Sequence, residues 1–354
     1  MRVRSIPLLF LALLLCGCHA RVSDMPVGKA VEISIPLGLP SLSIPKDNPP
    51  TIATIALGRE LFYDKRLSQN DTLACSSCHN PQMAFSDGER LSKGVMGQRA
   101  LRNSPTVLNA AYSPSQFWDG RAQSLEAQSA APISDPLEMN QPHAVSFKKI
   151  AENANYRAMF REAFGTDDVT LARIEKSLAS FERTLLSGDS TFDRYQYARG
   201  KDAQPDALTV QQVRGFAVFM NPMRGNCAAC HMVGSQSALF ADGKFHNTGE
   251  GVGENSETFS DVGRFAETHV ATDTGAFKTP TLRNVALTAP YMHDGKLKTL
   301  KEVVDFYAGG GNSNPYLDAE MKKIHMTPQD REDLVEFLQA LNGSMPANSG
   351  PPAQ

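Results

Sequence analysis

A five-residue pattern that occurs twice constrains this chain more than any other feature. Its copies are Cys75-Ser-Ser-Cys78-His79 and Cys227-Ala-Ala-Cys230-His231. Cys-x-x-Cys-His is the attachment pattern of c-type haem. The two thiols add to two vinyl groups of the porphyrin, and the imidazole of the next residue then lies under the iron. The pattern therefore predicts two covalently bound haem c groups, with His79 and His231 as iron ligands.

The first residues predict export from the cytoplasm. Arg2 and Arg4 precede a short apolar run, as in a secretory signal. The order Leu15-Cys16-Gly17-Cys18 is similar to a bacterial lipoprotein cleavage site, so we expect a signal peptide at 1–17 and a lipid anchor on Cys18 in the periplasm. Ordinary cleavage to a soluble periplasmic protein is the alternative. Exported cysteines often form disulfides, but the His after each pair favours haem.

Length and apolar spacing predict an all-α chain of two tandem cytochrome c-like haem domains with long loops. Its 354 residues fit two domains, which we place at 51–204 and 205–344. Apolar residues three and four apart predict helices at 52–66, 168–186 and 209–220, and Thr327-Pro328 begins a last helix. No window alternates with period two. The loops at 80–145 and 232–297 are rich in Gly, Pro, Asn and Ser, and we expect them to wrap the haems.

The two ends and the charge complete the outline. Closely spaced prolines predict an extended tether over 18–50, and the composition of 345–354 predicts a flexible tail. Lys and Arg number 35 and Asp and Glu 38, for a net charge of −3. A basic footprint is therefore missing, which argues against nucleic acid as a partner.

Further short motifs occur between and after the haem patterns. In chain order they are Arg102-Asn103-Ser104-Pro105-Thr106, Gln116-Phe117-Trp118-Asp119-Gly120-Arg121, Glu138-Met139-Asn140, Gly263-Arg264-Phe265, Lys278-Thr279-Pro280, Leu282-Arg283-Asn284 and Leu287-Thr288-Ala289-Pro290-Tyr291-Met292-His293-Asp294-Gly295. Together with the haem patterns, the series resembles the bacterial di-haem cytochrome c peroxidase family, which includes the MauG-type enzymes.

The resemblance implies different roles for the two haems. The haem on His79 is expected to be the peroxide site, and the haem on His231 the site of electron input. Other members place a distal His between the first haem pattern and Arg-Asn-Ser-Pro, whereas residues 80–102 here contain no His. Met96 lies in that stretch, where a packing or surface role is expected. We therefore predict a five-coordinate iron at the first haem, as in MauG-type members.

The resemblance also assigns residues to the peroxide site. Glu138 matches the distal acid, which would move a proton from the near oxygen of peroxide to the far one. Gln128 and Pro132 match positions that shape the distal pocket and exclude water. Trp118 matches the tryptophan between the two haems, a path for electrons.

Two further assignments concern metals. Tyr307 matches the position that supplies the sixth ligand of the second haem iron, and Met292 is the rival ligand. Family members also hold a calcium ion between the domains. The matching positions are the side chain of Asn103 and the backbone carbonyls of Thr288 and Pro290, whose oxygen atoms suit Ca²⁺.

These expectations lead to one leading functional hypothesis and two alternative hypotheses. The leading hypothesis is a di-haem peroxidase that reduces hydrogen peroxide to water with electrons from a small periplasmic donor, a cytochrome c or a cupredoxin. One alternative is a MauG-like enzyme that oxidises a protein or another large substrate. The other is an electron-transfer cytochrome in which both irons are six-coordinate. The resemblance also suggests a homodimer.

Overall fold

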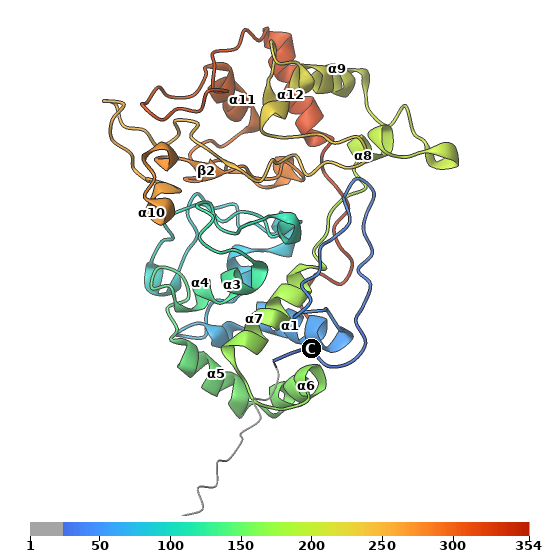
Figure 1. Cartoon of the computed structure of the whole chain (residues 1–354), viewed down its shortest axis with the longest axis vertical. Helices are drawn as coiled ribbons and strands as arrows, with labels where there is room; N and C mark the ends of the chain where they lie inside the picture. The colour runs from blue at the N-terminus through green and yellow to red at the C-terminus, as the bar shows by residue number, and fades with distance from the viewer. Residues whose placement is uncertain (1–23, 354) are drawn as a thin grey trace, which may run out of the picture.

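Two lobes, stacked along the long axis of the molecule, make up the computed structural model, which describes residues 24–353 (Figure 1). The expected signal peptide and Cys18 lie outside these residues. Within them, no helix has the length and apolar character needed to cross a membrane. The helices and strands are α1 (Ile52–Tyr63), α2 (Cys75–Cys78), α3 (Leu125–Ser129), α4 (Ala131–Ser134), α5 (His143–Glu152), α6 (Ala154–Phe164), α7 (Leu171–Glu182), α8 (Thr191–Gln196), α9 (Val210–Met220), β1 (Phe245–His246), α10 (Phe265–Thr268), β2 (Phe277–Lys278), α11 (Leu300–Ala308) and α12 (Pro328–Gln339).

The N-terminal lobe is built around α1 and α7. Thr51 caps α1 by accepting a hydrogen bond from the Thr54 amide. A Cβ added at Gly58 would lie 1.9 Å from the carbonyl oxygen of Ser177 on α7, so glycine is what allows the two helices to approach this closely. Buried aromatic rings, including Phe62 and Phe181, and aliphatic side chains fill the space around them.

The C-terminal lobe repeats this plan with α9 and α12. Thr209 and Thr327 cap the two helices, as the sequence predicts for Thr327. Four buried phenylalanines form the centre of the core: Phe192, Phe219, Phe240 and Phe337. Phe192 belongs to α8, which precedes the boundary expected at 204/205. By its packing, α8 is therefore part of the second core.

The helical prediction is confirmed for most of the regular structure, with one exception. Strands β1 and β2 pair in an antiparallel sheet, with Phe245 opposite Lys278 and His246 opposite Phe277. Each strand has two residues, which is too short to produce the alternating pattern that identifies strands in a sequence.

The described part of the Pro-rich segment, 24–50, is extended and lies along both lobes (Figure 1). The Val27 amide donates to the Ala163 carbonyl in the first lobe, and the Gly38 carbonyl accepts from Ala238 in the second. At the other end of the chain, the expected flexible tail returns to α1, where Tyr63 donates to the Ser349 carbonyl. Both terminal segments are therefore hydrogen-bonded to the domains they flank.

Candidate haem sites

Both Cys-x-x-Cys-His patterns have a geometry that suits haem. In the described residues Cys75, Cys78, Cys227 and Cys230 are free thiols, available for attachment. Nδ1 of His79 lies 3.3 Å from the Phe85 carbonyl oxygen, and Nδ1 of His231 lies 2.8 Å from that of Phe240. Burial lowers the pKa of both imidazoles, which favours the neutral form. Each ring thus uses Nδ1 for the backbone and leaves Nε2 for an iron.

A cavity of about 500 Å³ lies over the second pattern. Cys227, Cys230 and His231 line it, which is the arrangement that attachment of a porphyrin requires. The volume lies within the usual range for a cofactor site. The residues present therefore fit a haem c in the C-terminal lobe.

Both rival sixth ligands lie on this cavity. Tyr307, on α11, and Met292, in the loop before it, are lining residues. Burial raises the pKa of the Tyr307 phenol, and in residues 24–353 its hydroxyl has no hydrogen-bond partner. Its oxygen is thus available as a ligand, and an iron bound in the cavity would be a partner for it. The choice between Tyr307 and Met292 stays a prediction.

Glu138 lies in the turn between α4 and α5, close to the first haem pattern. Its backbone carbonyl accepts from the Val95 amide at 2.8 Å, which ties the turn to the loop that follows the haem pattern. Burial, together with the charge of Asp135, raises the pKa of Glu138 to about 7, although Arg121 opposes this shift. At neutral pH such a carboxyl exists in both protonation states, so it can accept and return a proton.

The other residues predicted for this pocket differ in their hydrogen bonds and exposure. Pro132 accepts a hydrogen bond from the Met139 amide, next to Glu138. Gln128, on α3, makes no side-chain hydrogen bond within residues 24–353. The side chain of Met96 is 75% exposed, which agrees with the surface role expected for it. The roles of Gln128 and Pro132 stay predictions.

Trp118 comes from the N-terminal lobe and reaches the haem cavity of the C-terminal lobe. It lines the cavity, and its indole Nε1 donates to the Asn103 carbonyl at 2.8 Å. Its own carbonyl accepts from the Lys278 amide of β2 at 2.8 Å. The ring is thus fixed where the two lobes meet, and its role as a path for electrons between the haems stays a prediction.

Ion pairs surround Trp118 at this junction. The Arg102 guanidinium bonds Asp119 of its own lobe and, with two hydrogen bonds, Asp261 of the other. Arg264 donates to the Asp119 carbonyl at 2.7 Å. These charged contacts are largely buried and span the domains, so they hold Trp118 in a fixed position.

The three positions predicted to bind calcium face the same cavity. Asn103, Thr288 and Pro290 all line the large cavity. Nδ2 of Asn103 donates to the Glu89 carbonyl at 3.0 Å, which leaves its Oδ1 as the atom free to face a cation. Calcium binding by these residues stays a prediction.

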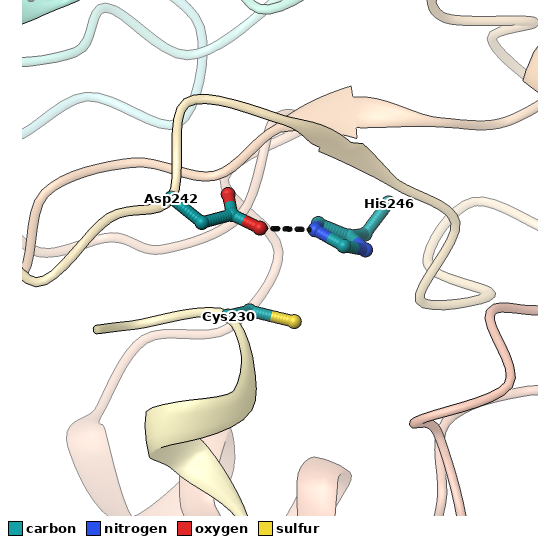
Figure 2. Close-up of side chains that lie close together, drawn as sticks. All are labelled: Cys230, Asp242 and His246. Carbon is teal, nitrogen blue, oxygen red and sulfur yellow. Dashed lines mark hydrogen bonds and ion pairs between the residues drawn. The ribbon is translucent and has the colours of Figure 1, made fainter.

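Cys230, Asp242 and His246 form a cluster whose ligand atoms all lie within 4.8 Å of one another (Figure 2). Residues of these types hold transition metals in proteins. The Cys230 sulfur, and the carboxylates of Asp318 and Asp242, raise the pKa of His246 to about 10. The haem uses the Cys230 sulfur for its thioether bond, so this cluster belongs to the edge of the haem site. The sequence did not predict a role for His246 because Asp318, which contacts its imidazole, lies 72 residues away in the chain.

A buried carboxyl near the first haem pattern was also missed. Glu182, at the end of α7, is 5% exposed, and burial raises its pKa to about 8. It makes no side-chain hydrogen bond in residues 24–353 and acts electrostatically on Cys75. Glu is common on helix surfaces, so no sequence signal distinguishes it.

Comparisons with known proteins agree with this geometry. Residues 52–203 match the di-haem cytochrome c peroxidase family, and residues 212–342 match cytochrome c. The chain is 40% identical to the methylamine utilization protein MauG of Methylorubrum extorquens, covering 85% of this chain and 81% of that protein. It is 34% identical to the cytochrome-c peroxidase IdrP1 of Denitromonas iodatirespirans, covering 88% and 87%.

One solved structure is similar in fold and shares a third of the aligned sequence. It is a crystal structure of a MauG-like protein associated with microbial copper homeostasis, with a TM-score of 0.79 and 33% identity. The similarity covers 89% of this chain and 96% of that one. The geometry of both haem patterns and the relatives lead to the same conclusion: the chain belongs to the di-haem cytochrome c peroxidase family, in its MauG-like branch.

Proposed function

We propose that the protein reduces hydrogen peroxide to water, with electrons from a small periplasmic donor such as a cytochrome c or a cupredoxin. One peroxide takes up two electrons and two protons and yields two waters. The haem on His79, when bound, supplies the iron at which peroxide binds. The haem that His231 would hold would supply the site of electron input, and Trp118 would provide the path for electrons between the lobes.

The residues around the first haem have distinct roles in this proposal. The Glu138 carboxylate accepts the proton from the near oxygen of peroxide and returns it to the far oxygen, which leaves as water. Gln128 and Pro132 shape the pocket and exclude bulk water. The observation that carries the proposal is the pKa of Glu138, raised to about 7 in a turn held against the loop that follows the haem pattern.

Electron paramagnetic resonance of the ferric holoprotein tests this assignment. We expect one high-spin signal from the His79 haem and one low-spin signal from the His231 haem. Two low-spin signals, together with failure to bind cyanide, would contradict the proposal and favour an electron-transfer cytochrome.

A second candidate is MauG-like oxidation of a protein or another large substrate. The relative named MauG at 40% identity, and Tyr307 on the cavity of the second haem, support it. Steady-state assays with reduced cytochrome c and peroxide separate the candidates. Rapid turnover supports the peroxidase, whereas negligible turnover with normal peroxide cleavage supports the MauG-like reaction.

Several properties complete the proposal. We place the protein in the periplasm, held at the membrane by a lipid on Cys18, and expect a homodimer. Tyr307 is the proposed sixth ligand of the second haem iron. A calcium ion bound by Asn103, Thr288 and Pro290 would join the lobes through oxygen ligands.

A further inference from the structure

Lys278 is a cation without a partner at the edge of the second haem cavity. It lies on β2 and lines the cavity. In residues 24–353 its ammonium makes no hydrogen bond or ion pair. Burial lowers its pKa to about 8. Lys278 is half-buried. A partly desolvated ammonium without a counter-charge is costly, so an anion bound in the cavity would compensate it.

The short sheet fixes the backbone of Lys278 at this edge of the cavity. Phe277 is buried and stacks on His293 with ring centroids 3.6 Å apart, which fixes the direction of its side chain. Phe277, Lys278 and His293 all line the same cavity. The Lys278 amide is held by the Trp118 carbonyl, so the backbone at this position is fixed as well.

The acidic side chains around the cavity already have partners. Asp242 and Asp318 each contact a nitrogen of His246, at 2.9 and 2.6 Å. Glu320 accepts from the Asn226 amide group. The other lysine on the cavity, Lys322, is exposed. Among these residues, Lys278 is the half-buried charge that has no hydrogen-bond or ion-pair partner.

We propose that Lys278 is a cofactor-binding residue whose ammonium forms an ion pair with a propionate of the haem on His231. Each haem c carries two propionate carboxylates, and the cavity that Lys278 lines is the one formed by Cys227, Cys230 and His231. The inference rests on haem attachment in the C-terminal lobe and not on peroxidase turnover. Because β2 also binds the Trp118 carbonyl, the ion pair fixes this edge of the haem relative to the indole.

Reduction potentials of the second haem test the proposal. In the holoprotein, Lys278→Gln removes a positive charge and leaves a propionate uncompensated, which favours the ferric state. We expect the reduction equilibrium constant to fall at least tenfold, or 59 mV for a one-electron couple. The propionate bands in resonance Raman spectra should shift. Lys278→Arg should restore the potential, and Lys322→Gln, an exposed lysine on the same cavity, should change it less than twofold.

Two outcomes would overturn the assignment. One is a Lys278→Gln protein with a wild-type potential and unchanged propionate bands. The other is a pH-dependent potential of the second haem in the wild-type protein, a measurement that needs no variant. An ion pair keeps Lys278 charged, so the potential of the second haem should stay constant from pH 7.5 to 9. A fall in potential centred near pH 8 would show an unpaired Lys278.

Discussion

Replacement of Glu138 by Gln is the sharpest test of the peroxide chemistry. Gln has nearly the same shape but cannot accept a proton, so we expect peroxide cleavage to slow by about 10²–10⁴-fold at pH 8. The raised pKa also gives the effect a pH dependence. With a pKa of about 7, roughly 1% of Glu138 is ionised at pH 5 and nearly all at pH 9. The wild-type rate should therefore rise about tenfold per pH unit below 7 and level off above it.

The assay is stopped-flow mixing of the ferric protein with peroxide, followed at the Soret band from pH 5 to 9. The advantage of wild type over Glu138→Gln should shrink about 100-fold between pH 8 and pH 5, since ionised Glu138 is lost. Glu175→Gln, which neutralises another partly buried carboxyl of this lobe, is the control and should leave the profile unchanged. Equal rates for wild type and Glu138→Gln at pH 8 would refute the reasoning, as would a profile with its midpoint near 4.5.

The remaining predictions concern neighbouring groups and packing. Asp135→Asn removes a negative charge that raises the pKa of Glu138, so the midpoint of the rate profile should move to lower pH; a move upward would be inconsistent with this. The folded-state pKa of Glu182 is raised to about 8, so stability due to its neutral form is present below pH 4.5 and lost as pH rises to 8. Thermal melts should show a smaller loss for Glu182→Gln over this range, and parallel curves would refute the assignment. Tyr307→Phe should alter the low-spin haem spectrum, and an unchanged spectrum would transfer the ligand role to Met292 or solvent. Gly58→Ala places a Cβ against the Ser177 carbonyl and should cost about 1–3 kcal/mol in chemical denaturation, whereas unchanged stability would mean that α1 and α7 separate easily.

Local patterns allowed much of this molecule to be predicted. The haem patterns require only neighbouring residues, and the caps at Thr209 and Thr327 are set within a few residues of each helix start. The apolar stripes of α1 and α7 likewise follow from helical periodicity. These features depend on short-range geometry that a sequence records directly.

Features that depend on distant contacts were not predictable in this way. Phe192 packs against Phe240 and Phe337, so α8 joins the second core despite its place in the sequence. Glu182 and Lys278 are ordinary surface residue types, and only the fold shows that Glu182 is buried and Lys278 half-buried, both without hydrogen-bond partners. The short sheet of β1 and β2 likewise forms between residues far apart in the chain.

The segment before α1 has a practical consequence for any shortened version of this protein. Its Gly38 carbonyl accepts from both Ala238 and Arg283, and its Leu37 carbonyl accepts from Asp189. Arg283 is itself 1% exposed. A protein that begins at residue 51 would keep every proposed haem ligand. It would nevertheless lose the Gly38 carbonyl, which accepts a hydrogen bond from the buried Arg283 guanidinium, and the segment that contacts both lobes. Deletions within residues 24–50 should therefore be avoided in any shortened version of the protein.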